Sequence, residues 1–118
     1  MKTLFLLLFS LTGLAALGQQ KPNPITVADS TKKIQVLETA CGQCQFGLKE
    51  KGCLLAVRIK GQAYFVDGTS IDEHGDAHAD DGFCNAIRKA EVQGTVVKGR
   101  FKATYFRLLG KEEKPATH

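Results

Sequence analysis

The chain has 118 residues, with 16 Lys and Arg against 12 Asp and Glu, a formal charge of +4 and four cysteines. This length allows one domain and excludes folds that need several hundred residues. A mean hydropathy of −0.12 excludes a polytopic membrane protein, and 43% hydrophobic residues exclude a wholly disordered chain. Because the cationic residues are spread along the sequence rather than gathered in one basic run, we expect no nucleic-acid partner.

Residues 1–18 have the pattern of a secretory signal peptide. Lys2 precedes an apolar run from Leu4 to Leu17, and small residues stand at Ala16 and Gly18, the positions that a signal peptidase inspects. An uncleaved membrane anchor is the alternative, but the run is shorter than the ~20 residues that span a bilayer. We therefore expect cleavage after Gly18, a secreted or periplasmic protein and, after cleavage, no membrane contact.

The remaining sequence divides into three parts. Residues 19–33 contain Pro22, Pro24 and several polar residues without a periodic apolar face, which is typical of a flexible linker. Residues 34–110 carry all four cysteines and are predicted to form the folded domain, followed by a polar tail at 111–118. A domain this small buries only about 60% of its unfolded surface, so a covalent or metal cross-link would stabilise it.

Hydrophobic periodicity predicts five strands and one short helix. The run 55–60 alternates with a period of two, and Phe101, Ala103 and Tyr105 are expected to point to one side of a strand. In chain order, we expect strands at 34–38, 55–60 and 63–66, a loop to residue 82, a helix at 83–91, and strands at 92–97 and 100–109. The second strand is expected to form one hairpin with the third, and the fourth strand another with the fifth.

The helix prediction depends on three apolar residues at helical spacing. Phe83, Ile87 and Ala90 would share one face, and Asp80 or Asp81 would cap the first turn. The resulting order, three strands, a helix and two strands, is that of an OB-type barrel, in which the helix closes one end. The predicted fold class is therefore mainly β with one short helix, a small OB-like barrel. An open α+β sheet under one helix is the alternative.

The four cysteines favour a disulfide framework or a metal site. An even cysteine count in a small secreted domain is typical of disulfides. Pairing Cys53 with Cys84 would close a long loop and stabilise the domain by roughly 3.7 kcal/mol, whereas Cys41 with Cys44 closes only a short one. A third hypothesis is thiol–disulfide redox chemistry at the C-x-x-C motif, but Gly47 and Gly52 predict a loop where that chemistry needs a helix.

The metal hypothesis uses cysteine and histidine together. The C-x-x-C spacing lets both sulfurs of Cys41 and Cys44 approach one ion. The other candidate ligands are Cys53, His74, His78 and Cys84. Soft thiolates favour zinc or copper(I), while an oxidising compartment opposes the site because the thiolates must stay reduced.

In the loop after the predicted third strand, acidic residues and histidines alternate along the sequence. Asp72, His74, Asp76, His78 and Asp80 occupy every second position and would project to one side of an extended segment. The spacing does not fit an EF-hand calcium loop. The alternative interpretation is a solvated loop that leads into the helix.

No conventional catalytic set is visible in the sequence. The motif Gly-x-Ser-x-Gly and glycine-rich phosphate loops are both absent. The sequence therefore predicts a non-enzymatic binding module, stabilised by disulfides, with soft-metal binding and redox chemistry as the alternatives. Its ligand and partner stay open.

A set of motifs carries a family resemblance. The segments Cys41-Gly-Gln-Cys44, Gly52-Cys53, 67–72 (DGTSID) and 74–88 (HGDAHADDGFCNAIR) together resemble an uncharacterised family of small, secreted, largely bacterial proteins with a domain of unknown function. The resemblance covers about 34–109. It implies a signature of C-x-x-C, a third cysteine and a His-containing segment that ends in a fourth cysteine, here Cys41, Cys44, Cys53, His78 and Cys84. It implies no activity.

Overall fold

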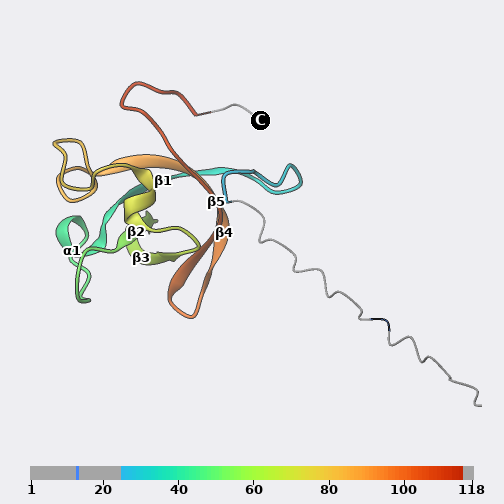
Figure 1. Cartoon of the computed structure of the whole chain (residues 1–118), viewed down its shortest axis with the longest axis horizontal. Coiled ribbons are helices and arrows are strands. Elements are labelled where there is room, and N and C mark those ends of the chain that lie inside the picture. Colours follow the sequence, from blue (N-terminus) through green and yellow to red (C-terminus); the bar gives the residue numbers. More distant parts are fainter. Residues whose placement is uncertain (1–12, 14–24, 116–118) are drawn as a thin grey trace, which may run out of the picture.

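The computed structural model describes residue 13 and residues 25–115, so the predicted signal peptide lies, except for residue 13, outside the described residues. Five strands form a closed barrel in the order β1-β2-β3-β5-β4 (Figure 1). Neighbouring strands are antiparallel except β3 and β5, which run parallel and close the barrel. The bounds are β1 (Gln35–Cys41), β2 (Leu55–Ile59), β3 (Gln62–Asp67), β4 (Arg88–Val97) and β5 (Arg100–Leu108). The predicted small OB-like barrel is confirmed.

The side chains of β5 alternate between the core and the outer face, and a one-residue shift in the pairing with β4 reverses this alternation. Phe101 and Ala103 belong to the core cluster, whereas Tyr105, expected on the same side, pairs with Gln93 and is buried on the opposite face. Between Gln93 and Gly94 the pairing with β5 shifts by one residue, and beyond the shift Phe106 joins the core cluster. A β-bulge of this kind lets one strand present successive residues to the interior.

The predicted helix at 83–91 is wrong. Residues 83–85 form a turn, and β4 begins at Arg88. Ala90 pairs with Leu37 of β1, and Ile87, expected on the buried helical face, is 41% exposed. The first strand needs a second neighbour to close the barrel, and that non-local pairing outweighs the local helical spacing. In the described part of the chain, the helical segments are α1 (Gly42–Gln45) and a 3₁₀ turn η1 (Ile71–His74), both in segments expected to be loop.

Both faces of β4 are covered in its first half. Ala90 and Val92 face the core, while Glu91 and Gln93, on the opposite face, are also buried. The Gln93 amide donates to the carbonyls of Asp29 and Lys32 and accepts from Asp29 N–H, each at 2.8 Å. Residues 29–32, which fall in the predicted linker, therefore lie against the barrel. On the same face Arg107 forms ion pairs with Glu91 and with the C-terminal Glu113.

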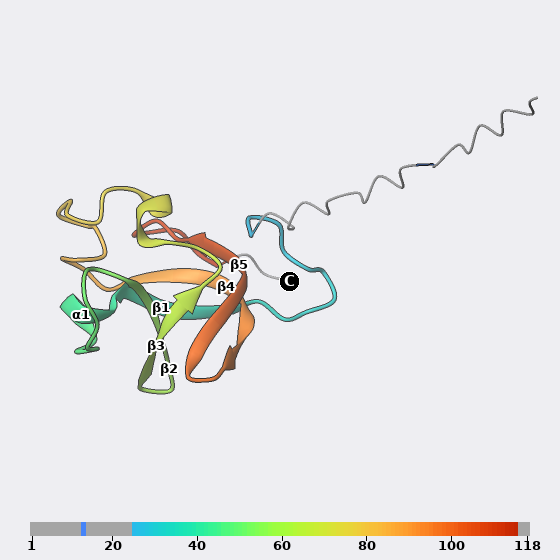
Figure 2. The ribbon, with the colours of Figure 1, turned by 60° about the horizontal axis from the view of Figure 1, so that its bottom comes forward.

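The loops gather at the two ends of the molecule. Figures 1 and 2 both place α1 and the loop 75–87 at one end of the barrel and residues 25–33 at the other. Within the described residues, no helix has the length and apolar character that a membrane span requires.

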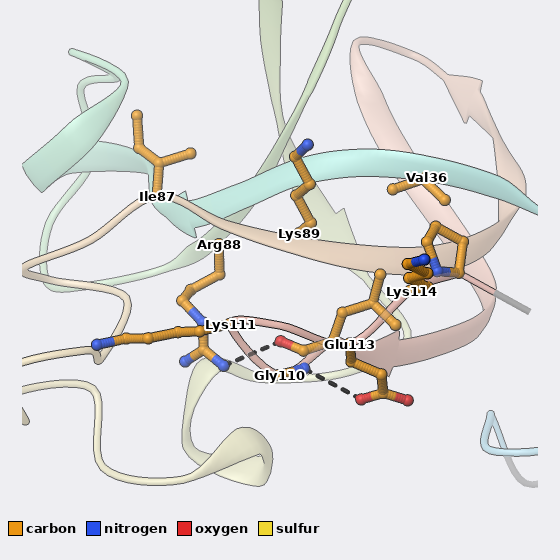
Figure 3. Close-up of a pocket in the computed structure, with 10 residues that line it drawn as sticks. Val36, Ile87, Arg88, Lys89, Gly110, Lys111, Glu113 and Lys114 are labelled. Atoms are coloured by element: carbon orange, nitrogen blue, oxygen red, sulfur yellow. Dashed lines mark hydrogen bonds between the residues drawn. The ribbon is translucent and has the colours of Figure 1, made fainter.

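A cavity of about 390 Å³ lies beside the start of β4 and the C-terminal segment (Figure 3). Two of its charged groups, Arg88 and Glu113, are already engaged in hydrogen bonds and ion pairs. Arg88 donates to the carbonyls of Leu109 and Asp81, and Glu113 accepts from Gly110 N–H and pairs with Arg107. None of the four cysteines lines it, so the cavity is separate from the cysteine cluster described below.

We predict that Gly94→Ala destabilises the barrel far more than Gly99→Ala. Gly94 has a φ of 154°, and a Cβ there would lie 2.1 Å from the Lys102 carbonyl oxygen, whereas a Cβ at Gly99, in the β4–β5 turn, would meet nothing within 4 Å. We expect about 3 kcal/mol or more of lost unfolding free energy for Gly94→Ala and about 1 kcal/mol for Gly99→Ala, measured by chemical denaturation. Equal losses would contradict the close approach at the bulge.

Candidate metal centre

The sulfurs of all four cysteines converge at one end of the barrel. The four Sγ atoms lie within 4.8 Å of one another. Cys53 Sγ is central, 2.7 Å from Cys41 Sγ and 2.9 Å from Cys84 Sγ. All four are free thiols in the structure, so the disulfide framework stays a prediction.

Three segments of the chain supply these sulfurs, and the barrel topology brings the segments together. Cys41 ends β1, Cys44 lies in α1, Cys53 stands just before β2, and Cys84 lies in the turn that leads into β4. β1 pairs with both β2 and β4, so the end of β1 and the beginnings of its two neighbours must meet at one edge.

Backbone hydrogen bonds fix the segments beside each cysteine. Cys41 N–H donates to the Phe83 carbonyl at 2.9 Å, and Gly42 N–H donates to the Leu54 carbonyl at 2.8 Å. Gly42 has no room for a side chain, because a Cβ there would lie 2.8 Å from Phe65 Cε1. The Cys41 segment is thereby joined to the residues next to Cys53 and Cys84.

Two glutamines of α1 add side-chain hydrogen bonds to the segments that carry Cys53 and Cys84. Gln43 Oε1 accepts from Leu54 N–H at 3.0 Å, and Gln45 Nε2 donates to the Cys84 carbonyl at 2.8 Å. Each neutral hydrogen bond of this kind contributes about 1 kcal/mol. The cluster is therefore held in place by the protein itself, before any ion or covalent bond contributes.

The thiols differ in acidity. Burial acts to raise the pKa of Cys41, but hydrogen bonds from the Cys53 and Cys44 thiols and from the backbone N–H groups of Cys44 and Gln43 outweigh burial and lower it. The pKa of Cys44 is raised to about 11, chiefly by its hydrogen bond to Cys41. Burial is the main cause that raises the pKa of Cys53, and its hydrogen bonds to Cys41 and Cys84 raise it further. Cys41 therefore loses its proton before Cys44 and Cys53.

The donor set fits a soft metal ion. Zinc takes four ligands in a tetrahedron, and Zn–S bonds of about 2.3 Å place the sulfurs of a Cys₄ site roughly 3.8 Å apart. The observed separations, from 2.7 Å to at most 4.8 Å, bracket that spacing. A cluster of four cysteines that could hold a metal ion is thus present.

His74 is half-buried and packs against two aromatic side chains of the core cluster. Its ring contacts Phe106 at 4.6 Å and Phe83 at 6.2 Å between centroids, and its Nε2 lies 2.8 Å from Thr69 Oγ1. The Thr69 hydroxyl donates its one proton to Glu73, so Nε2 must donate to Thr69. Burial lowers the pKa of His74, and the nearby Glu73 carboxylate only partly offsets this effect.

His78 lies at the surface with 81% of its side chain exposed, and its Nδ1 is 4.0 Å from Asp76 Oδ1. Neither its ring nor that of His74 belongs to the group of ligand atoms that the four sulfurs form. A ligand role for either histidine stays a prediction. The expected extended alternation from Asp72 to Asp80 is wrong, because the 3₁₀ turn η1 and a series of turns replace the extended backbone.

The family of unknown function DUF6370 matches residues 35–109. The chain belongs to this family. The match begins and ends with the barrel, from the first residue of β1 to the residue after β5. No curated protein and no solved structure matches the chain.

In this DUF6370 domain, the sequence pattern identifies the four cysteines but not the amides beside them. Gln43, Gln45 and Asn85 each lie next to a cysteine, and although the family motifs include Gln43 and Asn85, the sequence assigns none of the three a role in the site. Asn85 Nδ2 donates to the carbonyls of His78 and Ala79 at 3.0 and 2.9 Å and so ties the loop that precedes Cys84. Their adjacency to candidate ligands is the one signal in the sequence that points to them.

We predict that His74 makes the stability of the barrel depend on pH. Its pKa is lower in the folded than in the unfolded protein, so the unfolded chain binds more protons and stability is lost as the pH falls through about 6.5, by at most about 1.4 kcal/mol per pH unit. The measurement is the unfolding free energy of the reduced, metal-free protein between pH 5 and 8. His74→Gln should remove this component, whereas the exposed His78→Gln should keep it. A component lost with His78 instead would refute the assignment.

Proposed function

We propose that this domain is an exported soft-metal-binding module whose centre is formed by Cys41, Cys44, Cys53 and Cys84, with zinc as the fitting ion and copper(I) as its competitor. The observation that carries the proposal is the convergence of all four sulfurs within 4.8 Å. Two disulfides would require only that the sulfurs approach in pairs, whereas a single tetrahedral ion requires all four to face one point. The pattern of residues 1–18 supports export.

A disulfide-stapled state is the competing candidate, favoured by the position of Cys53 between Cys41 and Cys84. In an oxidising compartment, a bound ion would have to protect the thiolates from pairing. Both states use the same residues, so the metal content and the number of free thiols distinguish them.

Redox catalysis by the C-x-x-C motif has less support. Such chemistry needs an accessible thiolate. Cys41, whose pKa is lowered, is 0% exposed, whereas the exposed Cys44 has its pKa raised to about 11. The acidic thiol and the accessible thiol are therefore different residues, and we propose a binding module rather than an enzyme.

Native mass spectrometry of the reduced chain with zinc should give one ion per chain, and chelation should remove it. Cobalt(II) in place of zinc should give the absorption of a tetrahedral site with four thiolates. Because Cys41 and Cys53 are held within the cluster, Cys41→Ser and Cys53→Ser should each weaken binding by about 100-fold or more. His78→Ala is the matched control and should bind as the wild type does.

Two results would count against the proposal. The disulfide-stapled state would be established by two observations together. Protein purified without reductant would be lighter than the reduced protein by the hydrogens lost in forming two disulfides, and the reduced protein would bind no metal. Loss of binding in His78→Ala would place the imidazole in the centre instead of one sulfur.

A further inference from the structure

The four cysteines are unequally covered by protein. Cys41 is 0% exposed and Cys53 and Cys84 are half-buried, whereas Cys44 is exposed. A structural zinc site is closed, whereas a site that reacts with an incoming group keeps one position open to it. The cluster thus has one open side, and Cys44 lies on it.

The open side continues into the loop between Cys44 and Cys53. At both Gly47 and Gly52, which lie in this loop, an added Cβ would meet no atom within 4 Å. In contrast, a Cβ at Gly82, in the loop on the Cys84 side, would lie 2.4 Å from the Asp76 and Ala77 carbonyl oxygens. The loop that follows Cys44 is therefore open at both of its glycines, whereas the backbone two residues before Cys84 is closely covered.

The other three cysteines do not depend on Cys44 for their positions. Cys41 and Cys84 each donate from backbone N–H to a carbonyl, of Phe83 and Ala77, both at 2.9 Å. Leu54, next to Cys53, bonds Gly42 and Gln43. Loss of the Cys44 sulfur from an ion would leave three sulfurs fixed around it.

We propose that the centre exchanges its metal at Cys44 with a thiol-bearing acceptor, so that the module carries the ion rather than using it as a structural cross-link. This inference rests on the proposed function. In the exchange step, the acceptor thiol forms a new metal–sulfur bond, the bond from Cys44 to the metal breaks, and the acceptor's proton passes to the Cys44 sulfur. No atom changes oxidation state, and repetition at the remaining sulfurs transfers the ion.

The test measures zinc release from the loaded full chain to a chromogenic chelator at increasing concentrations of reduced glutathione. Attack at an open ligand makes the release rate rise in proportion to the thiol concentration, whereas release through unfolding gives a rate independent of it. Cys44→Ser should still bind one zinc and release it about tenfold faster, because its fourth position is already open. Cys84→Ser, on the covered side, should lose most of its zinc during loading.

The outcomes separate the two proposals. A loaded wild type whose release rate does not change with glutathione would overturn exchange at Cys44 and leave the metal centre intact. Exchange at Cys44 would also be overturned if Cys44→Ser binds no zinc while Cys84→Ser binds one. A reduced wild type that takes up no zinc would overturn the proposed function, and the exchange with it.

Discussion

The hydrogen bonds at the end of β1 hold the cysteine cluster together. Cys41 N–H reaches the Phe83 carbonyl, and Gly42 N–H reaches the Leu54 carbonyl, so one dipeptide joins the two segments that carry the distant cysteines. These bonds are possible only because β1 pairs with β2 on one side and β4 on the other. The closed barrel therefore fixes the site, and the sulfurs follow from the strand order.

The same arrangement separates the stability of the fold from the cysteine chemistry. Small domains that depend on zinc unfold without it, since they have too little apolar core. Here the core cluster draws on all five strands and contains Phe83, Phe101 and Phe106, with Cys41 as one buried member among twelve. A core of this kind supports a cluster that can gain or lose an ion while the backbone around it stays in place.

The sequence was informative where side-chain period and residue type decide the structure. The period of two in β2 and β5 predicted the hairpins, and C-x-x-C with two further cysteines predicted a cluster that could hold a metal ion. It failed at 83–91, where pairing with β1 outweighs helical spacing. It also could not show that Gln93 binds the segment before β1, a contact between residues 64 positions apart. The separation of His74 from the sulfurs likewise depends on packing against Phe83 and Phe106.

In the proposed metal centre, the uneven burial of the cysteines has an electrostatic reason as well as a functional consequence. Four thiolates around a divalent ion leave two negative charges, and taking such a group fully out of water is costly. Backbone N–H groups of Gln43 and Cys44 offset part of this cost at the buried Cys41 sulfur. At Cys44, the exposed cysteine of the C-x-x-C motif, contact with water offsets part of the same cost. The exposure that lowers the cost of forming the centre is thus the same exposure that opens it to exchange, and one cannot be removed without the other.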